Sequence, residues 1–91
     1  VLAIAEGMED AASYAQIRKI PCWAALGTER LALIEVPERV GTLYLAEDND
    51  GPGRCASMAA VGSHNMPERQ IIRDAPPSHY HDWAEALSNI R

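Results

Sequence analysis

The sequence of 91 residues contains no phenylalanine, two cysteines, and one lysine among its eight basic residues. Cys22 and Cys55 lie far apart and form no Cys-x-x-Cys pair, which excludes a disulfide framework and a zinc-ribbon site. We expect both to be small buried hydrophobic residues. No apolar run approaches the roughly 18–20 residues of a membrane helix, and the start lacks the order of a signal peptide. These absences exclude membrane and secreted proteins, and they predict a cytoplasmic location.

The length of 91 residues predicts one domain spanning residues 1–91, because most domains have roughly 100–150 residues. The chain begins inside an apolar run at residues 1–5 without an initiator methionine, which is typical of a domain taken from a longer, multidomain protein. The net charge of -5 argues against nucleic acid, whose phosphates attract Lys and Arg. However, six of the 13 acids gather in two short stretches, and the remaining chain is nearly neutral: Glu6, Glu9, Asp10, Glu47, Asp48 and Asp50.

Apolar runs alternate with Ala-rich amphipathic segments along the chain. Strands are predicted at residues 1–5, 21–26, 42–46 and 69–73, and helices at residues 9–19, 29–34, 55–61 and 82–90. This alternation predicts an α/β fold, a small doubly wound, Rossmann-like sheet of about four parallel strands flanked by helices. Thr28 is predicted to cap the second helix. We expect Trp23 and Trp83 in the core, and Arg69 and Arg73 as charged residues that keep an edge strand soluble.

Both acidic stretches follow predicted strands. Ligands of such folds bind at the carboxyl ends of the strands, near the point where strand order reverses. If the first and third strands are neighbours, Glu6 converges there with Asp48 and Asp50. Such close negative charges repel one another, and a hard divalent cation, Mg²⁺ or Mn²⁺, resolves the conflict. Gly51 and Gly53 allow a sharp turn into the next helix, whose N-terminal amides favour a phosphate group.

The two acidic stretches resemble the motifs of a known family. Glu-Gly-Met-Glu-Asp at residues 6–10 and Asp-Asn-Asp-Gly-Pro-Gly-Arg at residues 48–54, each after an apolar strand, look like the Toprim domain. Bacterial-type and phage primases, type IA and type II topoisomerases, OLD-family nucleases and recombination-repair proteins share this domain. The spacing of Glu6 and Asp10 is that of primases. Ala-Leu-Gly at residues 25–27 and the late Asp82 resemble the compact form in primase-helicase proteins of phages, plasmids and other mobile elements.

The resemblance covers nearly the whole chain and implies Mg²⁺-dependent phosphodiester chemistry. Glu6 would correspond to the family's general acid/base in nucleotidyl transfer, or to a metal ligand, and Asp48 and Asp50 to its metal-binding pair. Supporting roles fall to Asp10, Gly7, Gly53, Arg54 and Asp82. The compact forms often carry Lys-Asp where this chain has His81-Asp82. We expect His81 and His79 to be exposed.

The sequence therefore predicts the primase-type nucleotidyl-transfer domain of a DNA replication protein. DNA template and nucleotides would be held in the full-length protein, with fused or associated helicase and zinc-binding domains, because this piece lacks a basic groove. Two alternatives stay open: a Toprim nuclease that hydrolyses phosphodiesters, and a non-catalytic interaction module of a replication or repair complex. A receiver-like phosphoacceptor domain is disfavoured because the only lysine, Lys19, lies early, on a predicted helix.

Overall fold

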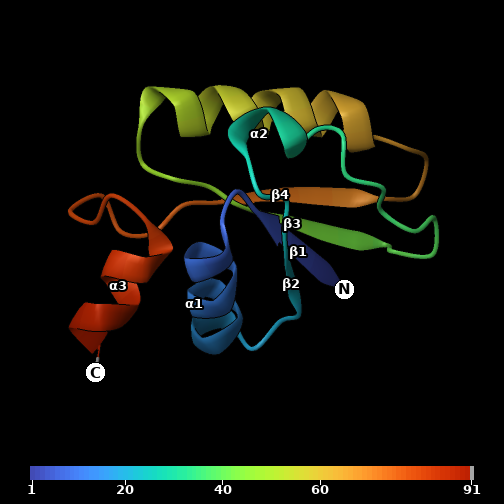
Figure 1. Ribbon diagram of the computed structural model, residues 1–91. Helices are drawn as coiled ribbons and strands as arrows, with labels where there is room; N and C mark the ends of the chain where they lie inside the picture. Colours follow the sequence, from blue (N-terminus) through green and yellow to red (C-terminus); the bar gives the residue numbers. More distant parts are fainter. Residues whose placement is uncertain (91) are drawn as a thin grey trace.

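A computed structural model describes residues 1–90, which form a parallel sheet between two layers of helices (Figure 1). The elements in chain order are β1 (Leu2–Ala5), α1 (Met8–Arg18), β2 (Cys22–Ala24), the 3₁₀ helix η1 (Thr28–Arg30), β3 (Thr42–Ala46), α2 (Gly51–His64), β4 (Gln70–Asp74) and α3 (Trp83–Ile90). The strands are all parallel, in the order β2-β1-β3-β4. The prediction of a doubly wound α/β fold is confirmed, and strand order reverses between β1 and β3.

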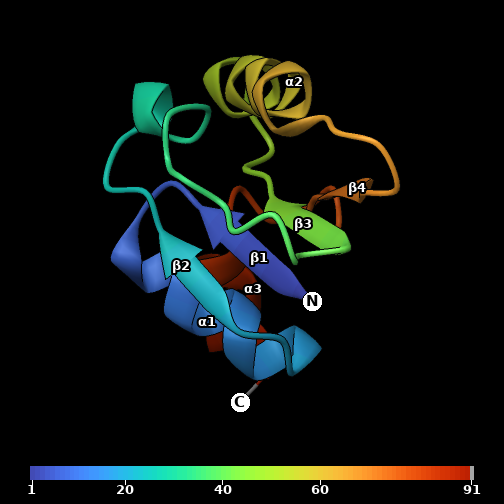
Figure 2. The ribbon, with the colours of Figure 1, turned by 90° about the vertical axis from the view of Figure 1, so that its right-hand side faces the viewer.

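The two layers of helices follow from alternation along the central strands. All four residues of β1 are buried. Leu2 and Ile4 pack in the cluster beneath α2, whereas Ala3 and Ala5 pack in the cluster shared with α1. A strand buried on both faces is typical of a parallel sheet. Figure 2 shows α2 and η1 on one side of the sheet, with α1 and α3 on the other.

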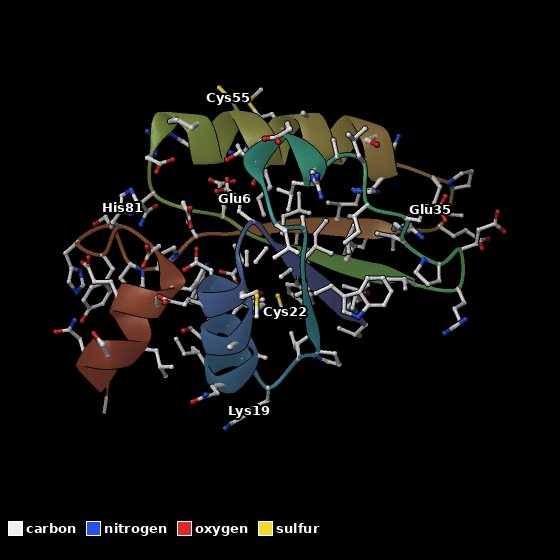
Figure 3. All side chains as sticks on the ribbon, in the orientation of Figure 1. Glu6, Lys19, Cys22, Glu35, Cys55 and His81 are labelled. Atoms are coloured by element: carbon white, nitrogen blue, oxygen red, sulfur yellow. The ribbon has the colours of Figure 1, made fainter. Side chains whose placement is uncertain are left out.

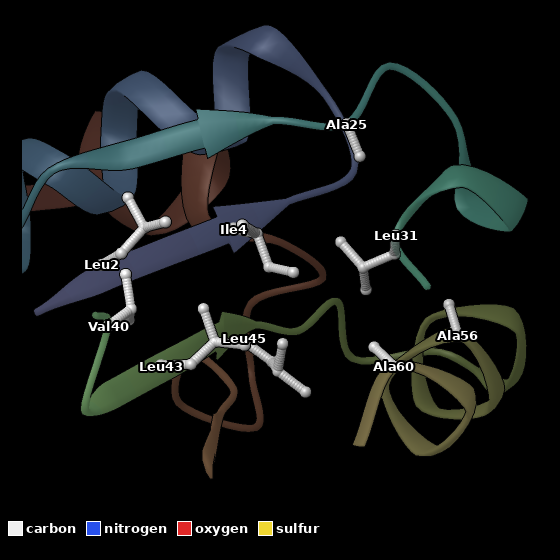
Figure 4. Packing of buried hydrophobic residues seen from close by; sticks show 9 residues of the cluster. All are labelled: Leu2, Ile4, Ala25, Leu31, Val40, Leu43, Leu45, Ala56 and Ala60. Carbon is white, nitrogen blue, oxygen red and sulfur yellow. The ribbon is translucent and has the colours of Figure 1, made fainter. Parts of the chain in front are cut away.

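Each face has its own core. Beneath α2, branched side chains of β1 and β3 meet small alanines of the helix (Figure 4). Ala56 and Ala60 on α2 let the helix backbone approach the sheet closely. On the other face, the rings of Tyr14 and Trp83 meet edge to face, 4.8 Å apart at 89°. Tyr14 comes from α1 and Trp83 from α3, so this pair joins the two helices of that layer.

Two predicted helices differ from the observed ones. In place of a helix at residues 29–34, the structure has the short 3₁₀ helix Thr28–Arg30. Thr28 is not its cap, because the Thr28 hydroxyl donates to Glu6. α2 begins earlier and ends later than predicted, at Gly51 and His64. Its end is held by the buried His64, whose Nε2 lies 2.9 Å from the carbonyl oxygen of Leu31.

Several residues do not lie where the sequence predicts. Trp23 is 42% exposed on the edge strand β2, whereas Trp83 is buried as expected. Cys22 is half-buried and Cys55 is exposed, so the prediction of two buried cysteines is wrong. The edge position of the strand at residues 69–73 is confirmed. No helix within residues 1–90 has the length and apolarity to cross a membrane.

Both arginines of this segment have partners within the fold: Arg73 is exposed on the edge strand β4 as expected, whereas the half-buried Arg69 is not the solvent-facing charge that the sequence predicts. The guanidinium of Arg69 donates to the carbonyl oxygens of Pro37, Val40 and His64 at 2.8, 2.9 and 3.0 Å. It thereby ties the end of α2 to the segment before β3. Arg73 donates to the buried carboxylate of Glu47 at 2.7 Å.

Candidate active site

The candidate site lies where β1 and β3 end. Ala5 and Ala46, the last residues of these neighbouring strands, are register partners. Glu6 and Asp48 therefore leave the sheet at nearly the same level. Asp10 joins them from the first turn of α1. The first and third strands are neighbours, which is the condition for the predicted convergence, and Glu6 and Asp48, about 40 residues apart in the chain, meet as expected. Asp50 instead contacts His81 and Gly53.

Asp48 is the centre of this cluster. It is 9% exposed, and the carboxyl groups of Asp10 and Glu6 lie within hydrogen-bonding reach of it. Burial, and then the charges of Asp10 and Glu6, raise the pKa of Asp48 to about 8. Burial also raises the pKa of Asp10, although the backbone amide of Ala84 donates to Asp10 at 3.1 Å. At neutral pH the cluster holds a proton that an ordinary carboxylate would release.

Glu6 is held by the segment that follows β2. Its Oε2 accepts a long hydrogen bond, 3.4 Å, from the hydroxyl of Thr28. Its backbone carbonyl accepts from the amide of Gly27 at 3.0 Å. Figure 3 labels Glu6 near the end of β1, below α2. Gly27 and Thr28 thus position Glu6, and Gly27 does so with a φ of 155°, which side chains other than glycine rarely allow.

Asp50 faces different partners. Its Oδ1 accepts from the amide of Gly53 at 2.6 Å and caps α2, and its Oδ2 lies 2.8 Å from Nε2 of His81. A Cβ on Gly53 would lie 2.8 Å from both the Asp48 carbonyl oxygen and Asp50 Oδ1, so only glycine fits there. The sequence predicts that amides at this helix end favour phosphate. The Gly53 amide is instead bound by Asp50, and Pro52 has none.

His81 and Asp82 complete this side of the site. His81 is exposed, as expected, and its Nδ1 lies 3.5 Å from Asp82 Oδ2. Hydrogen bonds to Asp82 and Asp50 raise the pKa of His81. Asp82 Oδ1 also accepts from the amide of Glu85 at 2.8 Å, within the first turn of α3. Asp82 therefore supports the start of α3 and contacts the histidine that reaches Asp50.

Asn49 fixes the segment that carries these residues. Its side-chain amide donates to the carbonyl oxygens of Pro76, Pro77 and Tyr80 at 2.9, 3.2 and 2.7 Å. Its backbone amide donates to the carbonyl oxygen of His81 at 2.7 Å. The sequence prediction misses this role, because the partners of Asn49 lie about 30 residues away in the chain. The segment 75–82 is thereby held against the end of β3.

The remaining candidates lie around this arrangement. Gly7 precedes α1 as its N-cap, and its carbonyl accepts from Ala11. Arg54 is exposed on the first turn of α2. Glu9 is exposed, and Glu47 pairs with Arg73 away from the cluster. The six clustered acids therefore divide: Glu6, Asp10 and Asp48 converge, and Asp50 faces His81 beside them.

A family model described as the Toprim domain matches residues 1–89 of the chain. This chain belongs to the Toprim domain family. Toprim domains are metal-dependent nucleic-acid-processing modules of primases and nucleases, and they typically bind Mg²⁺ through acidic residues. The resemblance drawn from residues 6–10 and 48–54 is confirmed. The comparisons found no match to this Toprim domain among curated proteins or solved structures.

The acids of this Toprim domain suit a hard cation that keeps part of its water shell. Within residues 1–90, no three His, Cys, Asp or Glu side chains are arranged to hold an ion by themselves. Mg²⁺ commonly takes only one or two protein carboxylates, with waters and substrate phosphates as further ligands. All the donors here are carboxylate oxygens, which Mg²⁺ prefers. Burial and then the charges of Asp10 and Glu6 raise the pKa of Asp48, and a bound cation would favour its charged form.

Proposed function

We propose that this Toprim domain performs Mg²⁺-dependent nucleotidyl transfer of the primase type in a DNA replication protein. The supporting observation is the cluster of Glu6, Asp10 and Asp48 at the ends of neighbouring strands, where burial and then the neighbouring carboxyl groups raise the pKa of Asp48 to about 8. A cluster of this kind destabilises a protein that does not bind a cation. Its position at the strand-order reversal is where ligands of doubly wound folds bind.

Asp48 and Asp50 are the residues that would hold the ion. Asp48 offers a buried carboxylate beside Glu6, and Asp50 is fixed on the first turn of α2 by the Gly53 amide. When bound, Mg²⁺ neutralises phosphate charge and aligns the reacting oxygens. Nε2 of His81 lies 2.8 Å from Oδ2 of Asp50 and helps to fix the orientation of that carboxylate.

Glu6 is the proposed general acid/base. Glu6 is half-buried, and its Oε2 accepts a hydrogen bond from the hydroxyl of Thr28. Glu6 would take the proton from the attacking hydroxyl group as its oxygen bonds to the α-phosphorus of a nucleoside triphosphate, and the bond from that phosphorus to the β-phosphate would break and release pyrophosphate. Asp10, anchored by the Ala84 amide, supports the cluster from α1.

The domain needs partners to hold a nucleic-acid strand. Three of its basic side chains are engaged within the fold: Arg18 with Asp74, Arg73 with Glu47, and Arg69 with backbone carbonyls. Few positive charges therefore remain for phosphates. We infer that DNA template and nucleotides are held largely by other parts of a longer protein, including helicase or zinc-binding domains.

The test is an assay of the full-length protein with Mg²⁺, a single-stranded template and labelled nucleotides. We expect incorporation of nucleotides, with a loss of at least about 100-fold in Glu6→Gln because general acid/base catalysis contributes about that much. Glu9→Gln, an exposed acid on α1, is the matched control and should retain activity. Cleavage of the template without incorporation would identify a nuclease instead. If the protein shows neither incorporation nor cleavage, the result would favour an interaction module.

A further inference from the structure

A hollow of about 320 Å³ lies between α1, α3 and the segment 75–82, apart from the acidic cluster. Its lining is mostly aromatic and apolar and includes Ile17, Arg18, Pro77, His79, Tyr80 and Trp83. This volume is at the lower end of the range for small-molecule sites. We propose that the hollow binds a single unpaired nucleobase, an inference that rests on the proposed function and extends it to base recognition.

The aromatic rings carry the proposal. The rings of His79 and Tyr80 lie 4.0 Å apart at 44°, on the outer side of the hollow. Trp83 is 1% exposed and is held in place by the ring of Tyr14 and by the guanidinium of Arg18, 5.0 Å from its centroid. Trp83 therefore forms a fixed floor of the hollow without a free ring face, and the exposed ring of His79 and the half-buried ring of Tyr80 are the ones on which a base can stack. Proteins bind unpaired bases by stacking them on such aromatic side chains.

The charge of the hollow favours a base over a phosphate group. Among the described residues that line the hollow, Arg18 is the one arginine or lysine. The guanidinium of Arg18 donates two hydrogen bonds to the carboxylate of Asp74, at 2.9 and 3.2 Å. This pairing balances the charge of Arg18 and holds its plane in a fixed position. A neutral planar ring, which needs no counterion, suits these surroundings better than an anion.

The hollow is joined to the acidic site by one fixed segment. Asn49 binds the carbonyl oxygens of Pro77 and Tyr80, so these backbone groups turn toward the end of β3. Tyr80 lines the hollow, and the next residue, His81, reaches Asp50 at 2.8 Å. The segment that lines the hollow therefore also carries the histidine that contacts Asp50. The base belongs either to a free nucleotide or to an unpaired strand.

The test follows the two indole N–H signals by NMR in the protein with EDTA present. Trp83 lines the hollow, whereas the exposed Trp23 lies on the edge strand β2 and serves as internal control. The probes are adenosine monophosphate, a short single-stranded oligonucleotide, and an abasic oligonucleotide with the same number of phosphates. We expect a base-containing probe to shift the Trp83 signal and the abasic probe to leave it unchanged. A shift with adenosine monophosphate would identify a free nucleotide as the source of the base. A shift with the oligonucleotide alone would identify an unpaired strand.

Variants make the test specific to stacking. Tyr80→Ala should weaken binding about fivefold or more, Tyr80→Phe should bind as the native protein does, and Met58→Ala, an exposed residue on α2, should have no effect. Equal binding of the abasic probe, or native affinity in Tyr80→Ala, would overturn the proposal. Mg²⁺-induced thermal stabilisation is measured in parallel. If Mg²⁺ stabilises the protein but no base binds, only the proposal of base binding fails. If a base binds but Mg²⁺ does not stabilise the protein, the metal-dependent function fails and the proposal of base binding stands.

Discussion

Replacing Asp48 with asparagine should stabilise the metal-free protein at neutral pH. Asp48 is almost fully buried, and its pKa of about 8 means that the folded protein holds a proton there at pH 7. The unfolded chain, with the ordinary value of 3.8, has released this proton. Folding must therefore take up a proton at pH 7. Asparagine needs no proton, keeps nearly the same shape, and offers amide hydrogens to the carboxylates of Glu6 and Asp10.

The size of the effect follows from proton linkage. For each pH unit above the unfolded pKa of 3.8, keeping Asp48 protonated in the folded state lowers the free energy of unfolding by about 1.4 kcal/mol. At pH 7 this gives an upper limit of about 4 kcal/mol. We expect the free energy of unfolding of Asp48→Asn to exceed that of the native protein by about 1–4 kcal/mol at pH 7. The advantage should fall to about 0.6 kcal/mol or less near pH 4, where the unfolded chain is already about 40% protonated at this position.

The assay is urea denaturation in EDTA at pH 7 and pH 4. Glu38→Gln, an exposed acid before β3, changes the net charge equally and should alter stability by no more than about 0.5 kcal/mol. A variant at Asp48 that is no more stable than the native protein at pH 7 would refute the reasoning. An advantage of equal size at both pH values would refute it as well, because the gain would then not come from proton uptake.

Three further substitutions test the contacts around the site. Gly53→Ala should cost about 1–3 kcal/mol in urea denaturation, since its Cβ meets Asp48 and Asp50, whereas Gly62→Ala in the same helix meets no atom and should be neutral or stabilising. Equal effects of the two would contradict the packing at Gly53. Asn49→Ala should cost about 1–3 kcal/mol and speed amide hydrogen exchange in residues 76–82, because three carbonyl oxygens lose their donor; unchanged exchange there would contradict its anchoring role. Tyr14→Phe should lower the free energy of unfolding by about 1–3 kcal/mol, since the Tyr14 hydroxyl donates to Asp74 at 2.8 Å; full native stability would show that this bond contributes nothing.

The sheet and the first site residues can be predicted from the sequence because their signals are local. Residues 1–5 and 42–46 are continuous apolar runs, and each is followed by clustered acids. The topology of parallel sheets then places the ends of neighbouring strands together, which brings Glu6 to Asp48. Glycine at position 53 is expected from a sharp turn, but its reason is different: it lies inside α2, where a Cβ would meet the Asp48 carbonyl oxygen and Asp50 Oδ1.

The other contacts are invisible to local pattern because they join segments far apart in the chain. His81 meets Asp50, and Asn49 meets Tyr80, across about 30 residues. Arg69 resembles a solvent-facing charge on an edge strand, but its guanidinium binds carbonyls that only the folded chain brings near. Trp23 lies in an apolar run that predicts burial, yet β2 is at the sheet edge and leaves the ring exposed.

The central claim, a Mg²⁺ site built on Asp48 and Asp50, is tested most directly by thermal unfolding during Mg²⁺ titration. At a Mg²⁺ concentration about tenfold above its Kd, binding adds about 1.4 kcal/mol, or roughly 6–11 °C in Tm for a domain of this size. Because the ion competes with the proton on Asp48, the shift should be larger at pH 8.5 than at pH 6.5. The account predicts that Asp48→Asn/Asp50→Asn abolishes the shift. A variant that responds to Mg²⁺ as the native protein does would contradict it.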